Sequence, residues 1–348
     1  MAFSSSVFSP QTRGTSLLSY STTTSSFIPT ATTTTRANAT TQKSFYQQPL
    51  RQTRRNNNYG INEVKPKRSS SSSSFGKVIV KAISKRYENV EVLSKEHLAV
   101  TLAYDVSQLS DKFSQERGAF TVVFSAGSSI NYLRKLVEAP YIGSIDWSKW
   151  HVFWVEEPVV PNDHLESNYK FAYNRFISKV PIPASNIHAM DDTLQADAAA
   201  EAYEATLKSL IENKVIASST NGLPRFDLTV LDMGPDGHVG ALFSDHPLLH
   251  ETNKWVSFLR DSPISPPQRI TLTLPVINAS SNIAMVVSGA GKANAVYSAL
   301  EEKEEDDDGG DGEKEEYSKL PAEMVVPYEG ELKWYLENGA ASKLFKKK

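Results

Sequence analysis

The segment FDLTVLDMGPDGH, residues 226–238, indicates the fold of this 348-residue chain more directly than any other. Residues 226–233 are mostly apolar, as in a strand buried on both faces, and residues 234–237, Gly-Pro-Asp-Gly, have the composition of a tight turn. In a parallel sheet, a turn at the carboxyl end of a strand is where α/β proteins bind ligands. The sequence therefore predicts a ligand-binding loop here, with a helix beginning at residues 239–243.

Apolar strand-like runs alternate with amphipathic helical stretches along most of the remaining chain. This alternation is typical of an α/β domain with an open, mainly parallel sheet flanked by helices, as in Rossmann-like folds. The expected strands are residues 120–124, 151–155, 226–233, 255–259, 269–274 and 283–288. The expected helices are residues 94–117, 167–179 and 193–213, and residues 320–344 also show helical periodicity.

The first quarter of the chain has a different composition from the rest. Residues 1–86 are dominated by Ser, Thr, Asn and Gln, and Glu63 is their only acidic residue. A hydroxyl-rich, basic and acid-poor segment cannot bury a core and is typical of an organelle transit peptide. It lacks the Arg-studded amphipathic helix of a mitochondrial presequence, which favours the chloroplast stroma. We expect a transit peptide and leader over residues 1–82, and a single domain over residues 83–348.

The charge of the body excludes several kinds of partner. Without residues 1–86 the chain keeps 24 basic and 39 acidic side chains, a net charge of about −15. Such a body repels nucleic acid and anionic membranes, so a phosphate-bearing ligand needs locally placed cations. The chain has no cysteine, which excludes disulfides and thiolate chemistry. No uncharged apolar run is long enough to span a membrane.

Residues 301–316, with the sequence EEKEEDDDGGDGEKEE, have no apolar side chain to bury. Such charge runs are usually solvated, and we interpret this one as an acidic loop insertion in the domain. The alternative is an acidic segment that docks to a partner protein.

His238 is the best candidate for acid–base chemistry. It follows the predicted turn, and an imidazole can accept a proton near neutral pH. Asp236, two residues earlier, could orient it. The alternative for these residues alone is an ordinary turn with no catalytic role. The histidines 151, 164, 238 and 246 match no common zinc motif, so no metal is expected.

The motifs around His238 resemble those of the 6-phosphogluconolactonase family. The turn and His238 are followed by Leu-Phe and then by Asp-His-Pro at residues 245–247, as in the family signature. Trp154 to Pro161 and the downstream Ser-Asn-Tyr at 167–169 resemble a second signature, and residues 262–273 and 288–292 match two later ones. Together these motifs span residues 120–344 in the family's order. The resemblance implies a fold like that of glucosamine-6-phosphate deaminase.

The same resemblance assigns a site for the substrate phosphate. Residues 124–129, Phe-Ser-Ala-Gly-Ser-Ser, resemble the family's phosphate loop, in which backbone N–H groups at a helix N-terminus hold the phosphate. They do not form the Gly-x-Gly-x-x-Gly fingerprint of dinucleotide binding, so no nicotinamide cofactor is expected. The residues expected to bind phosphate are Ser125, Gly127, Ser128, Ser129, Arg269 and Lys292.

The reaction implied by the resemblance is hydrolysis of 6-phosphoglucono-1,5-lactone to 6-phosphogluconate, a step of the oxidative pentose phosphate pathway. His238 would deprotonate the attacking water, and Asp236 would orient His238 or the sugar hydroxyls. Glu156 and Gly234 would contact the substrate. A lactone is an activated ester, so positioning and one base suffice without any cofactor.

Three residues in the expected site differ from the family pattern. Pro158 stands where the family has arginine, which removes a cation and a backbone N–H. Ala126 replaces a glycine of the phosphate loop, and Asp232 replaces a small residue before Met-Gly. The alternative function is therefore a catalytically weakened paralogue with a structural or regulatory role, bound to a plastid protein. A sugar-phosphate isomerase or deaminase is a weaker alternative.

Overall fold

The computed structural model describes residues 89–125, 127–301 and 319–344. The expected leader, Ala126, the acidic insertion after Glu301 and the terminal lysines lie outside these residues. No helix in the described ranges is long and apolar enough to cross a membrane.

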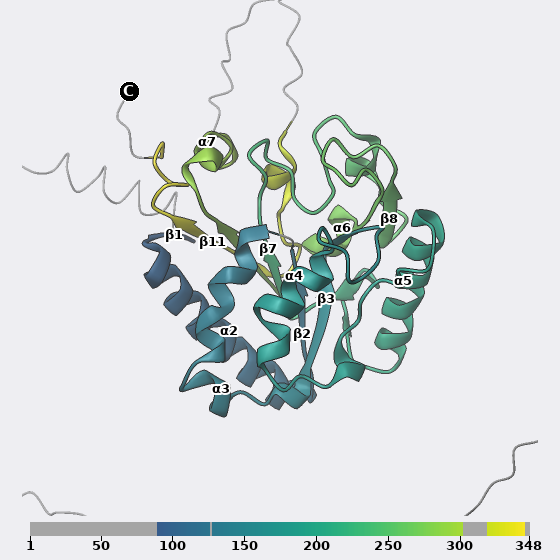
Figure 1. Ribbon diagram of the computed structural model, residues 1–348, viewed down its shortest axis with the longest axis horizontal. Helices are drawn as coiled ribbons and strands as arrows, with labels where there is room; N and C mark the ends of the chain where they lie inside the picture. Colours follow the sequence, from purple (N-terminus) through teal and green to yellow (C-terminus); the bar gives the residue numbers. More distant parts are fainter. Residues whose placement is uncertain (1–88, 126, 302–318, 345–348) are drawn as a thin grey trace, which may run out of the picture. The chain divides into compact units, whose positions relative to one another are not determined.

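A six-stranded sheet forms the centre of the described domain, and all its neighbouring strands are parallel. This confirms the expected open α/β architecture (Figure 1). From one edge to the other, the strands are β1 (Val90–Leu93), β11 (Glu331–Glu337), β10 (Asn282–Val287), β7 (Leu228–Leu231), β2 (Phe120–Phe124) and β3 (Trp150–Trp154).

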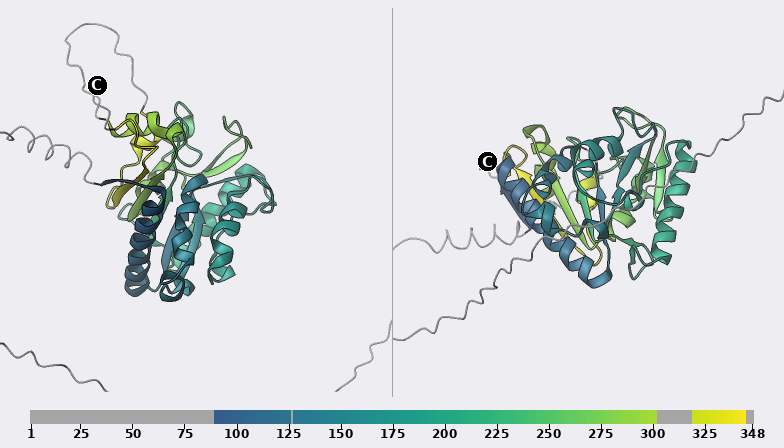
Figure 2. Two further views of the ribbon diagram at one scale, coloured as in Figure 1. Left: turned by 60° about the vertical axis from the view of Figure 1, so that its left-hand side comes forward. Right: turned by 60° about the horizontal axis from the view of Figure 1, so that its bottom comes forward.

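Helices cover both faces of this sheet (Figures 1 and 2). One face packs against α2 (Lys95–Arg117), the 3-10 helix η1 (Gly127–Val137) and α4 (Asn168–Arg175). The other packs against α5 (Ala196–Glu212), α6 (Leu274–Asn278) and α7 (Ala293–Leu300). The short elements between them are α3 (Tyr141–Ser144), η2 (Trp147–Lys149), η3 (Ile177–Lys179), η4 (Ala184–Asn186), η5 (Pro247–His250), η6 (Ala290–Lys292), η7 (Pro321–Met324), β5 (Ala217–Ser218) and β6 (Pro224–Arg225).

Local sequence explains where the first long helix begins and ends. Ser94 caps α2, because its hydroxyl oxygen accepts the backbone N–H of His97 at 3.3 Å. Gly118 ends the helix with a left-handed φ of 76°, a conformation that costs glycine little. The helix expected at residues 94–117 is therefore confirmed almost to the residue.

Two of the expected strands belong to a second, antiparallel sheet. This sheet has the order β4 (Glu156–Pro158), β9 (Arg269–Leu272) and β8 (Val256–Leu259). The chain passes from β3 directly into β4, and the backbone N–H of Val155 still donates to Phe124 of the main sheet, at 2.9 Å. Residues after Val155 thus turn from the main sheet toward β9 and form a wall beside the strand ends.

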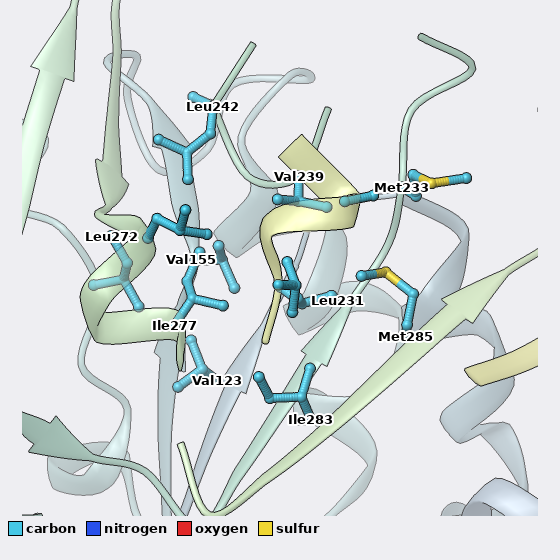
Figure 3. Close-up of a cluster of buried hydrophobic side chains, with 14 of the residues drawn as sticks. Val123, Val155, Leu231, Met233, Val239, Leu242, Leu272, Ile277, Ile283 and Met285 are labelled. Carbon is cyan, nitrogen blue, oxygen red and sulfur yellow. The ribbon is translucent and has the colours of Figure 1, made fainter. Parts of the chain in front are cut away.

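Alternating side chains of the main sheet enter two separate cores. On β2, Val122 and Phe124 pack in the core on the α2 side, whereas Val123 packs in the core on the α5 side. Figure 3 shows part of the α5-side core, where Val123, Leu231 and Ile283 lie together with Ile277 of α6. A strand buried on both faces is apolar throughout, which explains the unbroken runs in the sequence.

The helical periodicity of residues 320–344 gave a wrong prediction. Residues Glu331–Glu337 form strand β11, which lies between β1 and β10. Trp334 and Leu336 enter the α5-side core, and Tyr335 enters the α2-side core. Three consecutive buried side chains fit a doubly covered strand, and pairing with two neighbours outweighs a helical pattern.

The strand order reverses beside β2. The chain runs outward from β2 to β3, and then returns to place β7 on the other side of β2 and β10 beyond it. A crevice therefore opens outside the carboxyl ends of β2 and β7, at the position where open α/β sheets bind ligands. Both the segment 125–129 and the segment 232–238 begin at this crevice.

Candidate active site

A cavity of about 210 Å³ lies at the reversal of the strand order. Its walls come from the carboxyl ends of β2, β7 and β10 and from the first residue of β4. The lining residues are Ser125, Gly127, Glu156, Asp232, Met233, Gly234, Pro235, His238, Gly240 and Lys292. The fold thus brings together residues that lie up to 167 positions apart in the sequence.

The turn after β7 requires both of its glycines. The backbone N–H of Gly237 donates to Gly234 O at 3.1 Å, and the N–H of Gly234 donates to His238 O at 2.9 Å. Gly237 has a φ of 84°. A Cβ at Gly234 would lie 2.1 Å from the His238 ring and 2.5 Å from Asp236 Oδ1. Glycine at 234 therefore makes room for the pairing of the two side chains.

The helix expected at residues 239–243 is absent from the structure. The residues instead form a second tight turn, in which the N–H of Leu242 donates to Val239 O at 3.0 Å. Gly240 adopts a φ of 56°, and a Cβ there would lie 2.9 Å from Val155. The left-handed φ of Gly240 and its close approach to Val155, between β3 and β4, thus prevent the helix, and His238 lies between two turns.

The side chains of His238 and Asp236 form a hydrogen-bonded pair at the cavity. His238 Nδ1 lies 2.5 Å from Asp236 Oδ1, which fixes Nδ1 as the protonated nitrogen of the neutral ring. The ring also packs on Phe243, with 4.8 Å between centroids. Nε2 has no hydrogen-bond partner among the described residues and is left as an acceptor. This is the arrangement of a base held by a carboxylate.

The expected phosphate loop contributes Ser125 and Gly127 to the lining of the cavity, whereas Ser128 is not among the lining residues. Ser125 is tied to the sheet by its N–H, which donates to Val230 O at 2.9 Å. The backbone N–H and hydroxyl of Ser128 both donate to Asp232 Oδ2, at 2.8 and 3.0 Å. Ser129 is fully buried, and its hydroxyl has no hydrogen-bond partner in the described ranges. Ser129 therefore does not line the cavity.

Lys292 reaches the cavity from the loop after β10. Its Nζ lies 2.5 Å from Asp232 Oδ1. Ser288, at the start of the same loop, bonds to Ser128 with 2.9 Å between the hydroxyl oxygens. The sequence signature around 288–292 and the loop at 125–129 thus meet at one place, as the resemblance implies.

Arg269 is placed differently from the expectation that it binds phosphate. Its guanidinium donates to Glu156 Oε2 at 3.1 Å and to the backbone oxygens of Ser265 and Pro266 at 3.0 and 3.1 Å. The Arg269 and Glu156 side chains are only 9% and 7% exposed. Glu156 lines the cavity, whereas Arg269 lies behind it and holds the 264–266 loop against β4.

Pro158 and Glu157 have opposite orientations on β4. Residues 156 and 158 share a face because side chains alternate along a strand, so residue 158 faces the cavity side with Glu156. Glu157 points the other way, and its carboxylate accepts the backbone N–H groups of Asn168 and Tyr169 at 2.8 and 3.0 Å. It therefore caps α4.

Sequence reasoning missed this role of Glu157. Burial raises the pKa of its carboxyl to about 8, against the lowering effect of hydrogen bonds from Ser167, Asn168 and Tyr169. One signal in the sequence could have indicated it. The helix that starts at Ser-Asn-Tyr needs acceptors for its first backbone N–H groups, and an acidic residue lies ten positions before that start.

No group of three or more His, Asp or Glu side chains in the described ranges is arranged to hold a metal ion. The groups that line the cavity include an imidazole, two carboxylates, an ammonium and backbone donors.

Comparisons with known proteins show which family the chain resembles. The family model described as "Glucosamine-6-phosphate isomerases/6-phosphogluconolactonase" matches residues 93–334. The chain is 52% identical over 252 residues to "Probable 6-phosphogluconolactonase 4, chloroplastic" of Oryza sativa subsp. indica, covering 72% of this chain and 75% of that protein. It is 50% identical over 251 residues to "6-phosphogluconolactonase 3, chloroplastic" of Arabidopsis thaliana, covering 72% and 73%.

A solved structure shows the same fold. The 6-phosphogluconolactonase from Thermotoga maritima superposes with a TM-score of 0.57 at 25% identity, covering 71% of this chain and 98% of that one. By its sequence and its fold, the chain belongs to the glucosamine-6-phosphate isomerase and 6-phosphogluconolactonase family.

Proposed function

We propose that this chain hydrolyses 6-phosphoglucono-1,5-lactone to 6-phosphogluconate in the oxidative pentose phosphate pathway of the chloroplast. The observation that carries this proposal is the hydrogen bond between His238 and Asp236. His238 lines the cavity, and its Nε2 has no hydrogen-bond partner among the described residues. The names of the relatives from Oryza sativa and Arabidopsis thaliana support both the reaction and the location.

In the first step, His238 Nε2 accepts a proton from a water molecule, and the water oxygen bonds to C1 of the lactone. The carbonyl π electrons move to the carbonyl oxygen and form a tetrahedral intermediate. Asp236 stabilises the resulting imidazolium, since its carboxylate accepts a hydrogen bond from Nδ1.

In the second step, the carbonyl re-forms and the bond between C1 and the ring oxygen breaks. The imidazolium returns its proton to that ring oxygen, which becomes the hydroxyl of the open-chain acid. The base is thereby regenerated and no cofactor is consumed. Glu156 and the backbone around Gly234 face the cavity and are suited to contact the sugar hydroxyls.

Turnover can be tested on protein that starts near Ile83. Acid release from freshly prepared lactone is followed in a pH-stat, and spontaneous hydrolysis is subtracted. We expect His238→Ala to lower kcat by a factor of about 10² or more, the usual contribution of a positioned base. His250→Ala, which removes an exposed histidine outside the cavity, is the matched control. Equal rates for wild type and His238→Ala would contradict the proposal.

A second candidate function is a paralogue that binds a sugar phosphate but does not turn it over. The observation that favours it is the charge of the cavity lining, where Glu156 and Asp232 face a single lysine among the described residues. Binding of 6-phosphogluconate without any lactonase activity would favour this candidate.

The proposed chloroplast location can be tested with a reporter fused to residues 1–85. A mitochondrial or cytosolic signal would contradict that location.

A further inference from the structure

The carboxylate of Asp232 has the partners that a bound anion needs. Oδ2 accepts the N–H and the hydroxyl of Ser128, at 2.8 and 3.0 Å. Oδ1 lies 2.5 Å from Lys292 Nζ and 2.8 Å from the N–H of Met233. A backbone N–H at the start of a helix, a hydroxyl and an ammonium are the donors that proteins use to hold phosphate.

The Asp232 side chain also fills the space beside the Gly127 backbone. The Asp232 side chain is only 9% exposed. A Cβ built on Gly127 would lie 2.6 Å from Asp232 Oδ2, so the carboxylate lies directly against the backbone of the loop. A phosphate oxygen that accepted the Ser128 N–H would occupy the same volume as Oδ2. Only one of the two anions can use these donors at a time.

Lys292 and Arg269 are each paired with a carboxylate before any ligand arrives. Asp232 is paired with Lys292, Asp236 with His238, and Glu156 with Arg269. Lys292 is the only lysine or arginine among the lining residues in the described ranges. A phosphate dianion would therefore meet two carboxylates, Glu156 and Asp232, and no unpaired cation from the described lining.

We infer that the Asp232 carboxylate occupies the anion site of this cavity as a built-in ligand, and that Asp232 sets how weakly the chain holds the phosphate of its substrate. The inference rests on the proposed function only for the identity of the phosphorylated ligand. Phosphate can bind at Ser128 and Lys292 only after the Asp232 side chain has moved away. The wild type therefore binds phosphorylated ligands more weakly than a chain without this carboxylate would.

The test compares wild type with Asp232→Gly by calorimetric titration with inorganic phosphate and with 6-phosphogluconate. We expect Asp232→Gly to bind both at least tenfold more tightly, because the donors and the volume become free. Adding Lys292→Met to Asp232→Gly should abolish the gain. Asp261→Gly removes one exposed carboxylate outside the cavity and is the matched control for net charge.

Asp232→Asn covers the case in which the glycine variant fails to fold, since it removes the charge with little change in volume. It should also bind phosphate more tightly than wild type. The inference is overturned if neither Asp232 variant binds either ligand more tightly, or if the gain persists with Lys292→Met. If Asp232→Gly gains affinity but no variant hydrolyses the lactone, the inference stands and the proposed function fails.

Discussion

Replacing Asp236 by alanine should slow lactone hydrolysis by a predictable factor. Asp236 Oδ1 lies 2.5 Å from His238 Nδ1, so the variant removes a hydrogen bond that becomes charge-assisted when His238 takes up the proton. Asparagine is unsuitable, because it would precede Gly237 and Asn-Gly sequences deamidate to the acid. Alanine removes the carboxylate permanently and leaves the turn glycines unchanged.

The expected magnitude follows from the exposure of the pair. A hydrogen bond to a charged group contributes about 1.5–3 kcal/mol, and the lower end applies here because the Asp236 side chain is 54% exposed. About 1.4 kcal/mol corresponds to a tenfold change in rate. We therefore expect kcat to fall about tenfold in Asp236→Ala, against about 10² or more in His238→Ala.

The assay is the initial rate of acid release at saturating lactone, with kcat and KM fitted separately. If Asp236 acts through His238, the double variant should be no slower than His238→Ala alone, since the two residues act as a unit. Additive losses in the double variant would refute this reasoning and place Asp236 on the sugar hydroxyls instead. An unchanged kcat with a raised KM would have the same meaning.

Three further predictions concern the wall of the cavity and the stability of the fold. Pro158→Arg adds a cation on the face that Glu156 shares, and should lower the Kd of 6-phosphogluconate about tenfold by calorimetry, whereas the uncharged Pro158→Gln should not. Arg269→Met leaves the buried Glu156 carboxylate unpaired and should cost about 3–5 kcal/mol in urea unfolding, most of which adding Glu156→Gln should restore. Burial lowers the pKa of His188 from 6.5 to about 4, so its contribution to stability is complete above pH 6.5 and is lost as the pH falls toward 4. Because the His188 ring is partly exposed, we expect the free energy of unfolding to fall by about 2 kcal/mol over this pH range. The variant His188→Phe, which keeps the stacking on Phe153, should not show this fall.

The fold could be predicted from the sequence wherever a local signal agreed with the tertiary contacts. Residues 120–124 formed the expected strand, and α2 began at its serine cap and ended at Gly118. The prediction of helix was wrong for residues 331–337, which form a strand because pairing with β1 and β10 outweighs their helical spacing. The helix expected at 239–243 failed for a tertiary reason too, since Gly240 packs against Val155.

The residues that we propose for the site could be named from the sequence, whereas most of the hydrogen bonds between them required the structure. His238 and Asp236 are two positions apart, and the turn chemistry between them is local, so their contact follows from the sequence. The partners of Asp232, Ser128 in η1 and Lys292 in η6, are 104 and 60 positions away. No periodicity or turn signal encodes such distances. The resemblance assigns Arg269 to the substrate phosphate. Only the pairing of β9 with β4 shows that the Arg269 guanidinium forms an ion pair with Glu156.

Asp232 shows how the fold can remain while its ligand preference changes. The residue directly follows β7, where the backbone leaves the sheet and enters the Gly234 turn, and aspartate is accommodated there as glycine would be. Its carboxylate is stable at this position because the scaffold supplies anion donors there: the Ser128 N–H and hydroxyl, and Lys292. An acid at the same strand end without those donors would be a buried, unpaired charge and would destabilise the fold. The donors that we propose for an external anion also stabilise the Asp232 carboxylate, so a single substitution at residue 232 should change phosphate affinity while the strand and the turn keep their structure.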